Sequence, residues 1–330
     1  MITQITKDNV SLFEHLIPDD LIEDMMIRRD TFGLGCLRRD LDGYFDGFGA
    51  LVFVKECDEK ENIDNIRIKW LYVDSNRRDD GIGCELITDL FWEFGNTEVP
   101  TMTIDIPAIE DYEELGNFLT DWHFQFAPIY SLEFESELSA LKDNKYFSGI
   151  KKNTAIKGAT SLAEVDEKTL KVFLRELRKK YIKTGKHIDY MLTDYKMDYF
   201  DSNLSSVVIK NGVIEGALLV HTRPSGRLEI VVFDTLQDNK QAYLACLMSK
   251  SYQAALNSSI KNGRVYHETY NEKGMDLIDS IFGAHETPLV FRGIIENTGI
   301  AISTEQWEDM KEEYWNEHPD LYAVLKDMNN

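Results

Sequence analysis

Apolar residues follow two different periods in the first 140 residues of the chain. Residues 66–73, Ile-Arg-Ile-Lys-Trp-Leu-Tyr-Val, are rich in β-branched and aromatic types and predict a strand. Residues 84–92 place apolar side chains at helical spacing, and residues 101–106 alternate apolar and polar positions as a half-buried strand does. We therefore expect an α/β (α+β mixed sheet) fold.

Further elements complete the order of this first part. We expect strands at 2–6, 34–39 and 48–55, helices at 10–16, 18–29 and 112–122, and a strand pair or extended segment at 124–134. The dipeptides Asp42-Gly43 and Asp46-Gly47 are turn signals that join two of these strands as a hairpin. The predicted order is β-α-α-β-β-β-α-β-α-β.

The second part of the chain repeats this order of elements. We expect helices at 170–181, 238–256 and 275–282, strands at 206–210, 214–222, 228–233 and 265–269, and an extended segment at 289–295. The turns between strands are predicted by Asn211-Gly212 and by Pro224-Ser225-Gly226. The repetition predicts two domains of the same kind.

Two glycines mark the junction between the strand at 66–73 and the helix that follows it. Gly81 and Gly83 lie where that helix begins, so backbone N–H groups and the positive end of the helix dipole point at one place. Glycine lets an anion approach the main chain closely. Such a junction predicts a phosphate-binding site.

The spacing at this junction resembles the acyl-CoA pyrophosphate loop of GNAT-type N-acetyltransferases. In that loop a valine ends a strand, and Arg or Gln, two residues, Gly, one residue and Gly or Ala follow. The matching residues here are Val73, Arg78, Gly81 and Gly83. The loop is neither a dinucleotide fingerprint nor a P-loop, because the glycine spacing differs and no Gly-Lys-Ser/Thr follows.

The resemblance implies two tandem GNAT-like domains and acetyl-CoA as the co-substrate. It extends over nearly all of residues 1–140, because the predicted element order is that of the GNAT fold. We expect a GNAT-like domain at 1–140, a linker at 141–160, a second such domain at 161–300 and an acidic C-terminal helix at 301–330. The residues expected to bind acetyl-CoA are Leu71, Tyr72, Val73, Arg78, Asp79, Gly81, Ile82, Gly83 and Cys84.

Two features of the loops differ from the family pattern. Asp79 and Asp80 place carboxylates beside the expected pyrophosphate, which costs Coulomb energy that Arg77 and Arg78 can offset. The corresponding loop of the second domain, residues 233–240, has no glycine and no arginine. We therefore expect the second domain to be degenerate and the chain to bind one CoA.

The family also predicts a general acid, often a tyrosine in a pattern like Leu-Tyr-x-x-x-Gly-Phe. Here Leu119 occupies the tyrosine place and His123 the glycine place. Tyr112 and His123 are candidate substitutes for the acid, and Asp105 is a candidate base on the polar face of the strand at 101–106. A structural role is the alternative for each of them.

Charge is distributed unevenly along the chain, whose formal net charge is −22. Residues 1–140 hold 31 acidic and 11 basic side chains, a net −20, whereas residues 141–330 hold 27 and 25, a net −2. A negative field disfavours nucleic acid and anionic membrane and favours a cationic small-molecule amine or a basic peptide. Solubility is the alternative explanation of the charge.

The four cysteines are widely separated and form no Cys-x-x-Cys pair, so we expect neither a metal site nor a disulfide framework. Apolar runs are too short to span a membrane, and the N-terminus lacks a signal-peptide pattern. We therefore expect a cytoplasmic protein.

The leading functional hypothesis is direct transfer of an acetyl group from acetyl-CoA to a primary amine, which the charge predicts to be cationic. A non-catalytic acyl-CoA-binding or regulatory module is the alternative, because the usual tyrosine is missing and the loop is acidic. An interaction protein without CoA binding is disfavoured by Gly81 and Gly83. The sequence leaves open the amine, the acyl chain and the oligomeric state.

Overall fold

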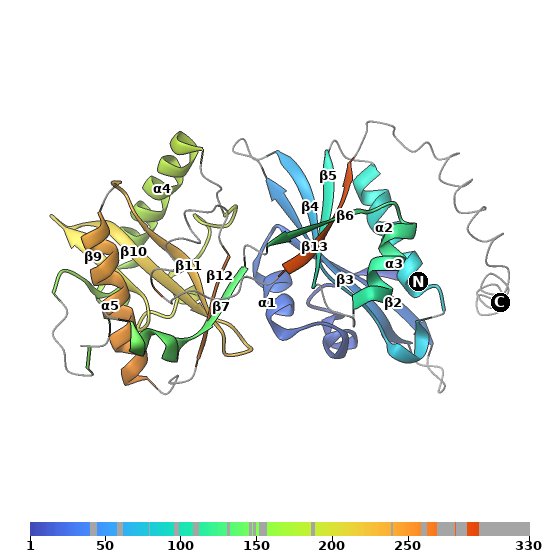
Figure 1. Cartoon of the computed structure of the whole chain (residues 1–330), viewed down its shortest axis with the longest axis horizontal. Coiled ribbons are helices and arrows are strands. Elements are labelled where there is room, and N and C mark those ends of the chain that lie inside the picture. Colours follow the sequence, from blue (N-terminus) through green and yellow to red (C-terminus); the bar gives the residue numbers. More distant parts are fainter. Residues whose placement is uncertain are drawn as a thin grey trace. The chain divides into compact units, whose positions relative to one another are not determined.

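The chain forms two compact units in a computed structural model (Figure 1). Unit 1 comprises Met1–Ile129 and the segment that begins at Val290, and unit 2 comprises Tyr130–Leu289. The structure describes residues 1–39, 45–57, 62–78, 80–95, 99–107, 112–130, 133–144, 147, 150–151, 157–185, 189–238, 240–258, 263–268, 281 and 289–296.

Unit 1 is built on a seven-stranded mixed sheet with the strand order β1-β2-β3-β4-β5-β13-β6. Its strands are β1 (Ile2–Gln4), β2 (Thr31–Arg39), β3 (Phe45–Cys57), β4 (Ile63–Val73), β5 (Thr101–Pro107), β6 (Gln125–Tyr130) and β13 (Leu289–Glu296). Its helices are α1 (Asp19–Ile27), α2 (Ile82–Gly95) and α3 (Glu113–Asp121), with short 3-10 turns at Val10–Leu12, Glu14–Leu16 and Ser75–Arg77.

Helices cover the two faces of this sheet with separate apolar clusters. The α2 and α3 face buries alternate residues of β4 and β5, among them Ile66, Ile68 and Ile104, against α2. The other face packs Ala50 and Val52 of β3 against α1 and the 3-10 turns. Alternation along each strand therefore sends one set of side chains toward each layer of helices, as the sequence pattern predicts.

Strand β13 comes from the far end of the described chain and lies between β5 and β6 (Figure 1). It runs antiparallel to β5, and Arg292 is the direct partner of Asp105 in the register. A Cβ atom on Gly293 would lie 2.7 Å from the ring of Phe126, so glycine permits the close approach of β6. Residues 289–295, expected in the second domain, instead pair in the sheet of unit 1.

Unit 2 is built on a six-stranded mixed sheet with the strand order β7-β12-β11-β10-β9-β8. Its strands are β7 (Glu133–Glu137), β8 (Thr160–Ser161), β9 (Ser206–Lys210), β10 (Val213–Thr222), β11 (Leu228–Thr235) and β12 (Arg264–Glu268). Its helices are α4 (Glu167–Thr184) and α5 (Gln241–Asn257), with 3-10 turns at Leu138–Asp143, Leu162–Glu164 and Met197–Tyr199.

The segment between the two predicted domains is part of unit 2. Strand β7 pairs antiparallel with β12, although residues 124–134 were expected to form one strand pair or extended segment. Leu141 and Phe147, within the expected linker, are buried in the apolar cluster that packs against α5. This basic stretch, predicted to be a linker, thus supplies core residues, because its few apolar side chains pack in the core of unit 2.

The turn predicted at Asn211-Gly212 agrees with the structure. The turn predicted at Asp46-Gly47 is wrong, because both residues lie within β3 and pair with β2, and Asp42-Gly43 lies outside the described residues. Asn211 and Gly212 have φ values of 52° and 78°, as a tight hairpin turn between β9 and β10 requires. The helices predicted at 275–282 and 301–330 lie outside the described residues, apart from Ile281. Within the described part of the chain, no helix combines the length and apolar character needed to cross a membrane.

Candidate functional site

Strands β4 and β5 are paired over only part of their length. Their parallel ladder joins Asn65–Ile68 to Thr101–Ile104 and then stops, while β4 continues along β3 to Val73. Lys69 is an extra residue in β4 at this point, because Val52 opposes Trp70 while Phe53 opposes Ile68. A β-bulge re-aims a strand and ends its pairing. The backbone of β4 after Ile68 therefore runs along an edge that β5 leaves.

The predicted pyrophosphate loop joins the end of this edge to helix α2. The Asp74 carboxylate accepts a 2.8 Å hydrogen bond from the Asn76 N–H and caps the 3-10 turn Ser75–Arg77. Gly81 then adopts the left-handed φ of 73°, and α2 begins at Ile82. Glycine is favoured at Gly81 because a Cβ atom is strained at positive φ. The loop thus presents the start of α2 at the end of β4.

Gly83 has a packing role as well. A Cβ atom there would lie 3.3 Å from the Phe118 ring of α3 and 3.8 Å from Val73. The glycine lets the first turn of α2 approach α3 and the end of β4. Close packing of a helix on a strand is one use of a glycine in such loops.

The two arginines of the loop are paired with carboxylates. Arg77 NH1 lies 3.1 Å from Asp80 Oδ2, and its guanidinium lies 5.1 Å from the ring centre of Phe48. Arg78 NH1 lies 3.4 Å from Glu114 Oε2, and both side chains are exposed, 54% and 88%. An ion pair so exposed contributes little stability and exchanges readily for another anion. Asp79 lies outside the described residues.

The remaining predicted loop residues mostly serve packing with their side chains. Ile82 is fully buried, and Leu71 and Val73 pack on the α2 and α3 face. Tyr72 stacks on Trp70 on the opposite face, with ring centres 6.1 Å apart. Cys84 is half-buried and is not in a disulfide. Only the backbone of these β4 residues therefore lines the diverging edge.

Helix α2 is held at its first turn by a cluster that the sequence did not reveal. Glu85 forms an ion pair with Arg38 of β2, and Cys36 of β2 lies beside it. Burial raises the pKa of the Cys36 thiol to about 11, so this thiol stays neutral at physiological pH. Glu85 in the first turn also suits the helix dipole. The contacts fix the helix start that the loop needs.

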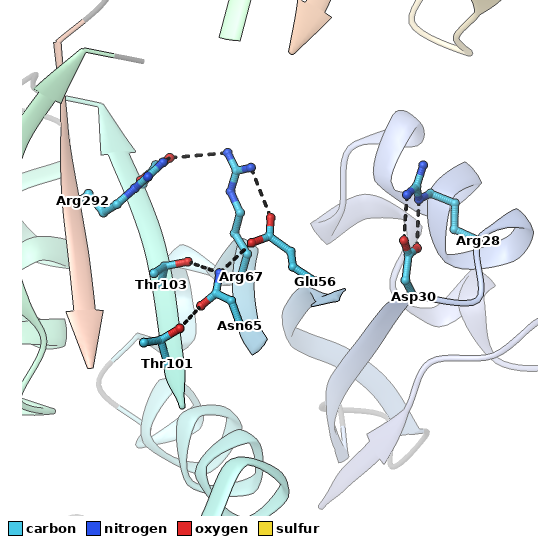
Figure 2. A network of polar contacts seen from close by, with 9 residues as sticks. Arg28, Asp30, Glu56, Asn65, Arg67, Thr101, Thr103 and Arg292 are labelled. Atoms are coloured by element: carbon cyan, nitrogen blue, oxygen red, sulfur yellow. Dashed lines mark hydrogen bonds and ion pairs between the residues drawn. The ribbon is translucent and has the colours of Figure 1, made fainter. Parts of the chain in front are cut away.

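Asp105, the candidate base, forms ion pairs with Arg67 and Arg292, which are labelled in Figure 2. Arg292 Nε and NH2 donate to its two carboxylate oxygens at 2.6 Å each, and Arg67 NH2 lies 3.4 Å from Oδ2. The hydrogen bonds to Asp105 raise the pKa of Arg292 above its ordinary value. Guanidinium donors from two neighbouring strands already engage both oxygens of this carboxylate. The geometry therefore argues against a general base at Asp105.

The network continues over neighbouring strands on the same face of the sheet (Figure 2). Arg67 NH1 lies 3.6 Å from Glu56 Oε1 of β3, and Asn65 Nδ2 donates to Glu56 Oε2 at 2.7 Å. Asn65 also bonds to Thr101 and Thr103 of β5. Polar alternation along β4 and β5 could have identified this face, but Arg292 belongs to a strand whose pairing the sequence does not reveal.

His123 serves the end of helix α3. Its φ is 67°, its N–H donates to Thr120 O at 2.9 Å, and the N–H of Phe124 donates to Leu119 O at 3.1 Å. These two bonds form a Schellman motif, in which the left-handed position usually holds glycine. His123 thus adopts the left-handed conformation expected of the glycine in the family pattern.

The other residues near α3 do not join Asp105. Tyr112 packs on the α2 and α3 face, and Leu119, at the place of the family tyrosine, is fully buried there. Asp105 alternates along β5 with the buried Met102, Ile104 and Ile106 of that face, so it lies on the opposite face of the sheet. The structure therefore does not bring the three candidate catalytic residues together.

Unit 2 repeats the bulge and the divergence of strands. Strand β11 pairs with β12 only at Leu228 and Glu229, and Val231 is an extra residue in the ladder to β10. Here the His267 Nδ1–H donates to the Ile230 carbonyl at 2.9 Å, so a side chain occupies a backbone acceptor at the point of divergence.

In unit 2, a lysine side chain occupies the position that corresponds to the pyrophosphate loop of unit 1. Lys180 of α4 lies 3.1 Å from both Asp234 Oδ1 and Asp238 Oδ1, and its ammonium donates to Thr235 O at 2.7 Å. Asp234 and Thr235 are the last two residues of β11, and Asp238 lies between β11 and α5. An anion would bind poorly here, because two carboxylates repel it and the lysine ammonium is already paired with them.

We expect one molecule of acetyl-CoA to bind per chain. Unit 1 has the glycine-bearing junction, whereas the junction of unit 2 is occupied by Lys180 and lacks glycine. Isothermal titration of the full chain measures the stoichiometry. Lys180→Met should leave it at one; a value of two for the unaltered chain would contradict the assignment.

Comparison with solved structures identifies the fold. A tandem GNAT protein from the clavulanic acid biosynthesis pathway is 13% identical, with a TM-score of 0.55 over 90% of this chain and 98% of that one. A GCN5-related N-acetyltransferase from Sphaerobacter thermophilus is 12% identical, with a TM-score of 0.51 over 90% and 95% of the two chains. The glucosamine N-acetyltransferase region of a fungal multi-domain β-N-acetylglucosaminidase is 11% identical, with a TM-score of 0.53 over 89% of this chain and 38% of that one.

No protein-family model and no curated protein matches the sequence. Among the described residues, no group of three or more His, Cys, Asp or Glu side chains is placed to hold a metal ion. The structural likenesses span most of the chain and confirm the predicted fold class. The chain has the tandem GNAT acetyltransferase fold.

Proposed function

We propose that the chain transfers an acetyl group from acetyl-CoA directly to a primary amine. The carrying observation is the geometry of unit 1, where β4 parts from β5 at the Lys69 bulge and then enters a glycine-bearing junction with α2. The fold of the structural neighbours supports acyl transfer as the reaction class. A reducing compartment such as the cytoplasm suits the four cysteines, none of which is in a disulfide.

Acetyl-CoA would bind through the backbone of unit 1. The N–H groups from Arg78 to Cys84 and the dipole of α2 would hold the pyrophosphate, and Gly81, with its left-handed φ, places no Cβ atom in the loop. The pantetheine arm would lie along the edge of β4 from Lys69 to Val73. Arg77 and Arg78 would exchange their present carboxylate partners for phosphate oxygens.

In the reaction the amine nitrogen attacks the thioester carbonyl, the new C–N bond forms, and the C–S bond breaks. The amine must first lose a proton, and about one lysine-like amine in 2,500 is neutral at pH 7. Because Asp105 is held by two arginines and Leu119 replaces the tyrosine, we assign the proton transfer to water. The CoA thiolate, with a thiol pKa near about 8.5, leaves without an acid and takes up a proton from solvent.

We propose further that the accepted amine is cationic, a small molecule or a basic peptide. The net charge of −20 in residues 1–140 supports this proposal, because such a field attracts cations and repels carboxylate-rich substrates. Raising the ionic strength from about 0.01 to 0.15 M shortens the Debye length from about 30 to 8 Å. We expect the second-order rate constant for a polyamine or aminoglycoside to fall by about tenfold over this range.

Thiol release across polyamines, aminoglycosides, basic peptides and acidic amino acids, at both salt concentrations, tests this proposal. Binding of the anionic acetyl-CoA is the internal control, because salt should weaken it less or strengthen it. Preferred turnover of an acidic amine without salt dependence would contradict the cationic acceptor. Acetyl-CoA binding without turnover of any amine would instead favour the alternative of a non-catalytic acyl-CoA-binding module.

A further inference from the structure

The Asp105 carboxylate lies at the point where the ladder between β4 and β5 ends. Ile104 makes the last backbone pair with β4, and Asp105 is the next residue of β5. Arg67 of β4 reaches this carboxylate at 3.4 Å from the same face of the sheet. A side-chain contact thus joins the two strands one step beyond their last backbone pair (Figure 2).

The same carboxylate is held from the other side by β13. Arg292 is the direct partner of Asp105 in the antiparallel register, and its planar fork makes two 2.6 Å hydrogen bonds. A bidentate arginine pair fixes direction as well as distance. The Asp105 side chain therefore contacts both β4 and β13. The backbone of β5 at this position pairs with β13 alone.

The surroundings make these contacts stronger than surface ion pairs. The side chains of Arg67, Asp105 and Arg292 are only 11%, 19% and 29% exposed. Glu56 of β3 lies beyond Arg67, so carboxylates and guanidinium groups alternate across β3, β4, β5 and β13. Opposite charges on neighbouring strands attract and are little screened when half-buried.

We propose that Arg67, Asp105 and Arg292 form a clamp that sets how far β5 parts from β4, and so sets the affinity of unit 1 for acetyl-CoA. The proposal rests on the proposed function of unit 1. Asp105 and Arg292 act as positioning residues through the strands they join. This role differs from that of a general base, which Asp105 would fill through its own proton transfer.

The two roles give different results with Asp105→Asn and Arg292→Gln. If the clamp operates, both variants weaken acetyl-CoA binding by about tenfold, and the double variant binds no more weakly than either one, because both remove the same element. Arg292→Lys keeps the positive charge and loses the forked guanidinium, so its affinity for acetyl-CoA should lie between that of the unaltered chain and that of Arg292→Gln. Glu135→Gln is the matched control, because it breaks a cross-strand pair with Arg264 in the sheet of unit 2 and should leave the affinity unchanged.

Titration calorimetry with acetyl-CoA gives the affinities, and amide hydrogen exchange tests the clamp without ligand. Faster exchange in Lys69–Val73 and Thr101–Pro107 of the folded variants supports it. Unchanged affinity and unchanged exchange in both variants would overturn it. So would a variant Asp105→Asn that binds acetyl-CoA normally and loses turnover together with the acidic limb of its pH profile, while Arg292→Gln keeps both. If the unaltered chain acetylates no amine, the proposed enzymatic activity is wrong. The acetyl-CoA affinities and the amide exchange rates still test the clamp in that case.

Discussion

Gly81→Val should abolish acetyl-CoA binding to unit 1 while leaving the chain folded. Gly81 has a φ of 73°, a conformation that costs a residue with a Cβ atom about 1–2 kcal/mol and a β-branched residue more. Valine would force the loop to move, and its methyl groups would occupy the place expected for the pyrophosphate. Losing most of the backbone hydrogen bonds to a doubly charged group should weaken binding by about 100-fold or more. Titration calorimetry measures the change.

The other glycines of the chain provide graded controls for this result. Gly83→Val, where a Cβ atom would lie 3.3 Å from Phe118, should also weaken binding, because α2 must move away from α3. Gly226→Val carries the same strain at a φ of 82° in a turn of unit 2 with no atom within 4 Å of a Cβ, and should bind acetyl-CoA normally. Undiminished affinity in a folded Gly81→Val/Gly83→Val chain would show that the loop is not the binding site.

Short-range patterns predicted the parts of this fold that short-range physics determines. The Asn211-Gly212 turn needs two positive φ values, which these residue types tolerate. The junction from Val73 to α2 needs an apolar strand, a left-handed glycine and a helix start within ten residues. Each signal lies within the segment that it describes, so no distant partner had to be known.

The sheet partners of β7 and β13 could not be predicted in the same way. Residues 133–137 and 289–296 have strand patterns that either sheet could accept, because such a pattern does not specify the neighbouring strand. Their pairing depends on contacts between segments far apart in the chain. These two strands were therefore assigned to the domain in whose sheet they do not pair.

The candidate site shows the same limit at the level of side chains. Alternation placed Asp105 on the polar face of β5, as the structure has it, and suggested a base. Its partner Arg292 is 187 residues later, and that pairing changes the chemistry of the carboxylate. At His123 the family pattern marked a glycine place, and the left-handed φ explains why that place matters. The role of a side chain that depends on a partner far along the chain could therefore not be predicted from the sequence.

A chain that ends at residue 288 should lose the fold of unit 1 and all binding of acetyl-CoA. Strand β13 lies between β5 and β6, so its removal breaks the seven-stranded sheet and exposes two strand edges. Val290 is buried, and Ile294 and Ile295 are half-buried. Burying such side chains contributes about 1.5–3 kcal/mol when complete, and domains are stable by only about 5–15 kcal/mol in total. The lost side chains and ladder hydrogen bonds together remove most of that stability.

The matched control is a chain that ends at Glu296, which retains every described strand of unit 1. Amide exchange, read separately for Met1–Ile129 and for α4 and α5, measures each unit, and circular dichroism melts measure the stability of the whole chain. We expect the shorter chain to lose protection in unit 1 alone, because none of the strands of the unit 2 sheet is removed. If the shorter chain binds acetyl-CoA as tightly as the control, then β5 and β6 do not need β13 between them, and the clamp through Arg292 loses its basis as well.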